Sequence, residues 1–245
     1  RRSSPRSVGF AALCFACLVY THNATALLAS PLILGYSFLL SWTRKSWSGL
    51  GRAAISILAG IMLSAHFWMP ALSERGLVQT EQLLTPPIFT YYTNFLTAGE
   101  LLAPPRAVLP HLLNPSPPKA LGAIAAVLAL IGSATLLRYL KSGDNRHTLS
   151  TNTSRSHLRY QAPLLAFFTI TLLSYASLTM SYSRPLWDTL PLLPFVQFPW
   201  RMLGVATLCA AVLCGAATQW FERFNRPWLG TSAIAALAML GHLSW

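Results

Sequence analysis

The chain has 245 residues, of which 53% are hydrophobic and only 10% are charged, and its mean hydropathy is +0.47. A soluble domain needs roughly 25% charged residues to cover its surface, so this composition excludes an ordinary soluble enzyme and predicts a protein that lies in lipid. The net charge of +12 does not indicate a nucleic-acid partner, because Lys and Arg occur in short clusters between apolar blocks and form no continuous basic face.

Seven apolar blocks follow one another along the chain, most of them close to the 18 to 20 residues that span a bilayer core. The first two, 8–21 and 24–42, are separated only by His22 and Asn23. A single helix through both would be about 52 Å long against a hydrocarbon core of about 30 Å, so we expect a hairpin or a pair of short helices. The remaining blocks are 53–69, 120–140, 162–180, 202–220 and 228–243.

Loop charges predict the orientation of these blocks, since Lys and Arg accumulate in cytoplasmic loops. With a cytoplasmic N-terminus, the inner side carries Arg1, Arg2, Arg6, Arg44, Lys45, Arg52, Arg138, Lys141, Arg146, Arg155, Arg159, Arg223 and Arg226. The outer side then holds only Arg75, Arg106, Lys119, Arg184 and Arg201 among the cations. The sequence therefore predicts an all-α, polytopic transmembrane helix bundle with about six complete crossings, forming a single domain over 1–245.

Three connecting segments are long enough to be described separately. The outer loop 71–119 is proline-rich, and its aromatic part, 88–102, predicts a short helix at the membrane interface. A second outer segment, 183–200, combines aromatic residues with Asp188 and several prolines. The inner segment 141–161 is rich in Ser, Thr, Asn and Arg and predicts a flexible linker. Both ends of the chain look cut from a longer protein, because it begins at Arg1 and stops within an apolar run.

Arg201 is the first candidate binding residue, because it begins an apolar block on the side where positive charge is disfavoured. A guanidinium there can bind a phosphate through two parallel hydrogen bonds, and the helix N-terminus adds partial positive charge. The alternative is an interfacial arginine that snorkels beside an aromatic belt, to which Trp68, Trp187 and Trp200 would belong.

Four further polar residues are candidates on the same side. His22 and Asn23 lie either at the mouth of a cavity that contacts a polar substrate or in a hydrated hairpin turn. Glu74 and Asp188 are the outer carboxylates nearest to helix ends. At the rim of a cavity such a carboxylate can act as a general base or hold a metal, although ordinary solvated loop residues are more common.

No sequence pattern predicts a cofactor or a metal site. Walker-A, dinucleotide-binding, nucleophile-elbow and H-E-x-x-H motifs are absent from the sequence. Cys14, Cys17, Cys209 and Cys214 lie inside apolar blocks, so we interpret them as buried free thiols. His66, within an apolar block, is expected to face the bundle interior or to hydrogen-bond a neighbouring helix.

Several local motifs occur together in one order. They are Thr21-His22-Asn23-Ala24 with Ser30-Pro31-Leu32, the run from Leu63 to Glu74, the outer aromatic loop, and Gln197-Phe198-Pro199-Trp200-Arg201. In this order they resemble the bacterial membrane proteins labelled as 6-pyruvoyl-tetrahydropterin synthase-related, which are similar to GT-C glycosyltransferases that use polyprenyl-phosphate donors. The label does not indicate pterin chemistry, since the chain has no three-histidine zinc site.

The resemblance implies a bundle in the bacterial cytoplasmic membrane with a site on its outer face and membrane lipid around it. It implies a polyprenyl-phosphate sugar donor, with Arg201 as the phosphate contact and His22, Asn23 and Glu74 as further substrate-binding residues. Asp188 joins them as a predicted substrate-binding residue because of its place on the same outer side, not because of the resemblance. The family's catalytic carboxylate belongs to a first outer loop that is expected to precede Arg1, so no catalytic residue is assigned. The alternatives are a transporter or flippase for a lipid-linked or small polar substrate, and a non-catalytic scaffold in envelope polysaccharide assembly.

Overall fold

The structure, a computed structural model, describes residues 5–74, 76–77, 89–104, 119–144, 152–220 and 227–240. All regular elements in these ranges are helical, and the only extended pairing is an isolated bridge between Leu96 and Met180. The fold is therefore all-α over the described part of the chain, as the sequence predicts. It divides into two compact units, Arg1–Asn94 with Pro185–Arg201, and Phe95–Arg184 with Met202–Trp245.

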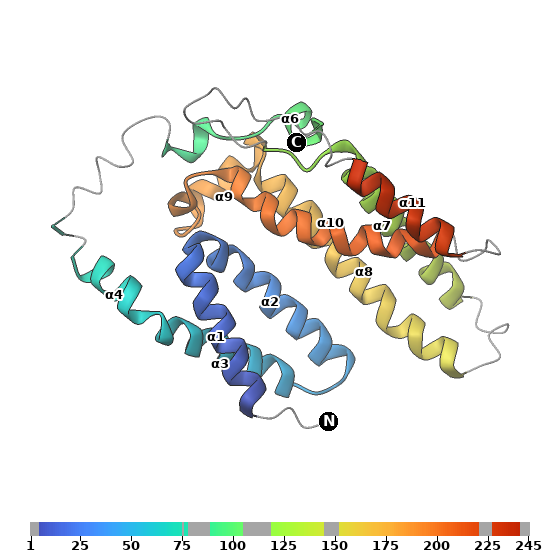
Figure 1. Cartoon of the computed structure of the whole chain (residues 1–245), viewed down its shortest axis with the longest axis horizontal. Coiled ribbons are helices and arrows are strands. Elements are labelled where there is room, and N and C mark those ends of the chain that lie inside the picture. Colours follow the sequence, from blue (N-terminus) through green and yellow to red (C-terminus); the bar gives the residue numbers. More distant parts are fainter. Residues whose placement is uncertain are drawn as a thin grey trace. The chain divides into compact units, whose positions relative to one another are not determined.

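The first unit is built on three helices that pack against one another (Figure 1). They are α1 (Pro5–Thr21), α2 (Asn23–Thr43) and α3 (Ser48–Leu63), followed by α4 (Ala65–Ser73). Its core joins Phe15 and Val19 of α1 to Ala26 of α2 and Ile57 of α3. Helix α1 ends and α2 begins on either side of His22, which confirms the predicted break in the first apolar run.

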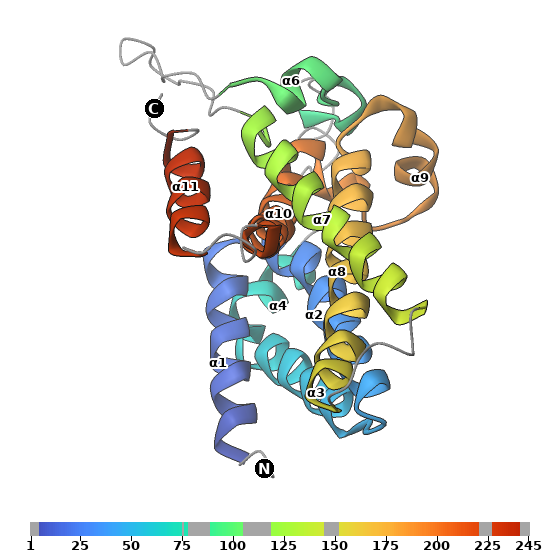
Figure 2. The same cartoon turned by 90° about the vertical axis from the view of Figure 1, so that its right-hand side faces the viewer.

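The second unit is built on α7 (Ala123–Asp144), α8 (Asn152–Leu178) and α10 (Leu203–Ala217), with α11 (Pro227–Leu240) beside α7. Figure 2 shows these helices after a 90° turn about the vertical axis, with α10 seen nearly along its axis. One side of α10 is fully buried, including Cys209, Leu213 and Ala217. Polar contacts add to this packing, because Thr169 of α8 donates a hydrogen bond to Ser133 of α7 at 3.0 Å.

Every predicted apolar block contains a helix, but the helices differ in length. Among the described residues, Asn23–Thr43, Gln161–Leu178 and Pro199–Trp220 are long and apolar enough to cross a membrane. Helices α3 and α4 give a fourth such span if they are counted together, although they meet at a bend of 64°. Helix α1 and the Ala123–Leu137 part of α7 are apolar but shorter.

The bend between α3 and α4 has a local cause in hydrogen bonding. The hydroxyl of Ser64 donates to the carbonyls of Gly60 and Ile61, and the Trp68 indole donates to Ile61 at 2.9 Å. The Tyr20 hydroxyl of α1 lies 2.9 Å from both the Leu63 carbonyl oxygen and His66 Nδ1. Side chains therefore add hydrogen bonds to carbonyls at the bend, two of which, Gly60 and Ile61, also accept from the Ser64 N–H. His66 contacts a neighbouring helix, which is one of its two expected roles.

Two loop predictions need correction. The predicted interfacial helix over 88–102 is split into a 3₁₀ turn, Tyr91–Thr93, and α6 (Ala98–Leu102). The reason is that Thr97 caps α6 while the Leu96 N–H pairs with the Thr179 carbonyl at 2.8 Å, which holds this stretch extended.

The predicted linker over 141–161 is shorter than expected. Helix α7 extends to Asp144 and α8 begins at Asn152, since polar residues can continue a helix beyond an apolar span. Residues 145–151 of this segment lie outside the described residues, as do 75, 78–88 and 105–118 of the loop 71–119.

Candidate functional site

Two segments about 100 residues apart in the sequence contact each other in the first unit. The Tyr91 ring stacks on the Trp187 ring with 5.4 Å between centroids and 15° between planes, and the Tyr91 hydroxyl donates to Asp188 Oδ1. Phe89 packs edge to face against Phe198 at 6.3 Å. Phe198 also packs against Trp200 at 5.4 Å. We call these two ring groups together the aromatic cluster, because both contact the segment 89–91; its rings are Phe89, Tyr91, Trp187, Phe198 and Trp200.

A hydrogen bond on one side and burial on the other hold the aromatic cluster in place. The turn that presents Tyr91 is closed by the Asn94 side-chain amide, which donates to the Thr90 carbonyl at 2.8 Å. On the other side, Trp187 lies in the short helix α9 (Arg184–Thr189) and is fully buried. A buried indole under a stacked phenol fixes the position of Asp188, the next residue along α9.

Arg201 folds back on its own turn. Gln197 has a positive φ of 63°, which turns the chain so that the Arg201 N–H donates to the Phe198 carbonyl at 2.9 Å. Arg201 Nη1 donates to the Val196 carbonyl at 2.7 Å, and the guanidinium carbon lies 4.9 Å from the centroid of the Phe198 ring. This cation–π geometry and the short hydrogen bond give the side chain one fixed arrangement.

The guanidinium retains capacity for a ligand. Arg201 is half-buried, and among the described residues its buried Nε has no hydrogen-bond partner. A guanidinium has five N–H donors, and the carbonyl of Val196 takes one of them. An anion that accepts from the remaining donors would satisfy a group whose burial without a partner is costly.

Asp188 is exposed and accepts a hydrogen bond from the Tyr91 hydroxyl. A carboxylate can accept several hydrogen bonds, so the bond from Tyr91 orients the Asp188 carboxylate and does not occupy every acceptor position. Sugar hydroxyls are donors that such a carboxylate binds, and exposed aromatic rings supply flat apolar faces beside it. Tyr92, next to Tyr91 and 51% exposed, provides such a face.

His22 and Asn23 cap a helix in this structure. His22 is the N-cap of α2, where its Nδ1 accepts a hydrogen bond from the Thr25 N–H at 3.1 Å. Asn23 Oδ1 accepts from the Ala24 N–H at 2.7 Å. Both side chains are exposed in the turn between α1 and α2, which fits the expected hydrated hairpin turn.

Glu74 ends α4, where its backbone N–H donates to the Pro70 carbonyl at 2.8 Å. Within the described ranges, no hydrogen bond, ion pair or ring contact joins Glu74, His22 or Asn23 to the aromatic cluster. Residues 89–91 therefore contact Asp188 and the turn of Arg201. The other three candidates, His22, Asn23 and Glu74, lie on separate turns.

Tyr91 was not singled out as a site residue by the sequence, although it contacts the predicted Asp188. Its only sequence signal is the density of aromatic residues between 89 and 95. That signal predicts an interfacial segment, but it does not reveal which ring faces which carboxylate.

Cysteine and metal chemistry receive no support from the described residues. All four cysteines are free, and no group of three or more His, Cys, Asp or Glu side chains in the described ranges could hold a metal ion. Cys209 is buried, but Cys14 and Cys17 are exposed, so the prediction of buried thiols is wrong for this pair. The reason is that the buried face of α1 runs through Ala12, Phe15 and Val19.

The chain matches no family model, no curated protein and no solved structure. The resemblance to GT-C proteins therefore stays a prediction.

Proposed function

We propose that this chain belongs to an integral membrane glycosyltransferase of GT-C type. It would transfer a sugar from a polyprenyl-phosphate donor on the outer face of the bacterial cytoplasmic membrane. The observation that carries the proposal is the aromatic cluster, in which residues 89–91 contact both the turn of Arg201 and the carboxylate of Asp188. A fixed cation for a phosphate and an oriented acceptor for hydroxyls are the two groups that a lipid-linked sugar requires.

Two contacts support four of the proposed six crossings, those by α2, α3, α7 and α8. The Leu96 N–H bonds to the Thr179 carbonyl, and the chain between these residues contains α7 and α8. Tyr20 bonds to the Leu63 carbonyl, with α2 and α3 between them. Two residues that contact each other at helix ends lie on the same side of a membrane. The chain between them must therefore cross the membrane an even number of times. One crossing by each of these four helices meets that condition.

The proposed reaction is an inverting displacement at the anomeric carbon of the donor. The acceptor hydroxyl oxygen forms a bond to that carbon while the bond to the phosphate oxygen breaks, and the electron pair leaves with the phosphate. Arg201 stabilises the charge that develops on the departing phosphate, and Asp188 binds sugar hydroxyls. The acceptor proton passes to a base that we do not assign to a residue of this chain.

Arg201→Ala in the full-length protein tests the assignment of the donor phosphate. A charge-assisted hydrogen bond is worth about 1.5–3 kcal/mol, so we expect apparent affinity for the lipid-linked donor to fall about 10- to 150-fold, with loss of transfer. The measurement is transfer of labelled sugar from polyprenyl-phosphate donors in reconstituted membranes. Unchanged transfer by Arg201→Ala would contradict the proposal.

Two controls separate ligand binding from support of the turn, because Arg201 also donates to the Val196 carbonyl. Phe198→Leu removes the ring beneath the guanidinium and keeps the charge, so it should reduce transfer less than Arg201→Ala. Arg106→Ala removes another cation of the predicted outer side and should leave donor affinity within about twofold. Thermal unfolding of each purified variant shows whether the fold is retained.

A transporter or flippase is the second candidate, and the break between α3 and α4 favours it. Broken helices line substrate pathways in many transporters, where their freed carbonyls coordinate ligands. Here Tyr20, Ser64 and Trp68 already contact the carbonyls at the break, so no substrate is needed to satisfy them. Donor-independent movement of a lipid-linked sugar across proteoliposomes would favour this candidate; a non-catalytic scaffold would instead tolerate replacement of both Asp188 and Arg201.

A further inference from the structure

Three exposed aromatic rings pack on one another at the end of α2 and in the turn that follows it. Phe38 and Trp42 of α2 lie 6.0 Å apart between ring centroids, and Trp47, just before α3, lies 5.6 Å from Phe38 and 6.4 Å from Trp42. The rings remain 46%, 65% and 54% exposed, respectively. Tryptophan rings with this exposure at the end of apolar helices are typical of residues at headgroup level in a bilayer.

Three cations share this end of the hairpin. Arg44 and Lys45 form the turn, and Arg52 lies one turn into α3. Over the described residues, none of their side chains makes a hydrogen bond or ion pair. The sequence contains no Asp or Glu before Glu74, so no acidic residue of the first three helices can neutralise them.

The turn itself is held in one conformation by hydrogen bonds. The Ser46 N–H donates to the Ser41 carbonyl at 2.9 Å, and the Leu50 N–H donates to the Ser41 hydroxyl at 3.1 Å. Ser41 is 2% exposed, and Lys45 adopts a positive φ of 50° between these contacts. The cations and the rings are therefore presented together on a defined turn.

We propose that the α2–α3 turn binds the headgroups of anionic phospholipids through Arg44, Lys45 and Arg52. The aromatic triad of Phe38, Trp42 and Trp47 would lie beside the glycerol region, which places the three cations at the phosphates. The partner is a lipid headgroup rather than a free ion, because rings and cations recognise an apolar and an anionic part of one molecule. This site is separate from the aromatic cluster and does not depend on the proposed transferase activity.

The test compares lipids on the purified full-length protein in detergent. Phosphatidylglycerol, phosphatidylcholine and inorganic phosphate are titrated separately, and bound lipid is measured by native mass spectrometry together with the unfolding temperature. We expect phosphatidylglycerol to bind more tightly than phosphatidylcholine, by about fivefold for each cation engaged, and the preference to fall as salt is raised from 0.1 M to 1 M. Inorganic phosphate should not raise the unfolding temperature.

Variants assign the preference to this turn. The triple change Arg44→Gln, Lys45→Gln and Arg52→Gln should abolish the preference for phosphatidylglycerol. The matched control Arg138→Gln, Lys141→Gln and Arg146→Gln removes the same net charge from another predicted inner segment and should retain most of the preference. Trp42→Leu with Trp47→Leu should weaken binding of both lipids by a similar factor, because it removes the rings and keeps the charges.

Each contrary outcome overturns the proposal. If the wild-type protein binds the two lipids equally, there is no anionic site, and this result does not require any variant to fold. If the control triple loses the preference as fully as the turn triple, net charge explains the effect. If inorganic phosphate stabilises the protein as much as phosphatidylglycerol does, the turn binds a free anion and the lipid assignment is wrong.

Discussion

Individual polar side chains in this protein mainly serve the backbone. His22 caps α2 and Thr97 caps α6. Ser64 and Tyr20 donate hydrogen bonds to backbone carbonyls at the bend after α3. Helix ends leave backbone groups unpaired, and away from water each such group is costly. A polar residue beside an apolar block is therefore as well explained by capping as by a ligand. Arg201 also donates to a backbone carbonyl, but among the described residues its buried Nε has no hydrogen-bond partner.

The capping box at α6 makes a pH-dependent prediction. Glu100 accepts hydrogen bonds from the Thr97 N–H and hydroxyl, which lower the pKa of its carboxyl below the ordinary value of 4.5. A lowered folded-state pKa means that the carboxylate stabilises α6 at neutral pH, and this contribution is lost as pH falls from about 4.5 through the lowered value. Carbon-13 titration of the Glu100 carboxyl should give a midpoint below 4.5.

Thr97→Ala supplies the matched comparison for that titration. It removes the hydroxyl donor and keeps the backbone N–H, so the Glu100 midpoint should rise part of the way toward its ordinary value. Hydrogen exchange at the α6 amides should become faster at neutral pH in the variant. A Glu100 midpoint that is the same in both proteins would contradict the role of the Thr97 hydroxyl.

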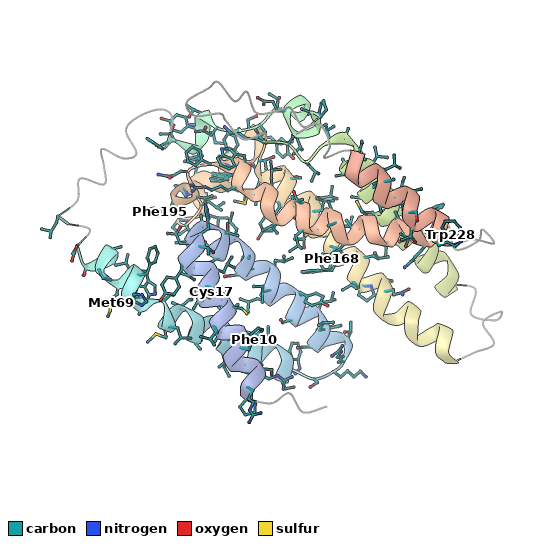
Figure 3. The ribbon with its side chains drawn as sticks, in the orientation of Figure 1. Phe10, Cys17, Met69, Phe168, Phe195 and Trp228 are labelled. Carbon is teal, nitrogen blue, oxygen red and sulfur yellow. The ribbon has the colours of Figure 1, made fainter. Side chains whose placement is uncertain are left out.

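At the level of helices, close backbone approach fixes which elements pair. A Cβ added to Gly132 of α7 would lie 1.8 Å from the Leu213 carbonyl oxygen of α10, and one added to Gly60 of α3 would lie 2.8 Å from the Ala12 carbonyl oxygen of α1. Small residues let apolar helices approach without a hydrophobic driving force from water. The exposed faces carry large apolar side chains instead, such as Phe10 on α1 and Met69 on α4 (Figure 3).

Gly132→Ala should destabilise the second unit, because backbone atoms of α10 must move to admit the methyl group. Overpacking of this kind costs about 1–3 kcal/mol, and we expect a clearly lower unfolding temperature in detergent. Gly215→Ala on α10 is the control, since no heavy atom lies within 4 Å of its added Cβ, and it should leave stability unchanged or slightly raised. Equal unfolding temperatures for the two variants would show that α7 and α10 do not pack this closely.

At the scale of the whole molecule, the test is on which side of the membrane each connecting segment lies. In a background with the four native cysteines replaced, Leu190→Cys should react with a membrane-impermeant maleimide in intact cells and Ser150→Cys should not. The proposed six crossings place residue 190 outside and residue 150 inside, so permeabilised cells should label both. Labelling of Ser150→Cys from outside intact cells would require a different number of crossings.

The sequence by itself determined that this protein is all-α and where its apolar helices lie along the chain. Each apolar block contains a helix, and the His22-Asn23 break falls between α1 and α2, because block length and local chain breaks are properties of neighbouring residues. It also identified Asp188 and Arg201, although their roles as ligand contacts remain proposals.

Only the tertiary structure decided which residues that are distant in the sequence contact one another. It showed Tyr91 against Trp187 and Asp188, Tyr20 at the α3–α4 bend, and α6 separated from the turn before it. These contacts join residues about 40 to 100 positions apart. Hydropathy carries no information about them, because they depend on close packing of helices and on the capping of individual backbone groups.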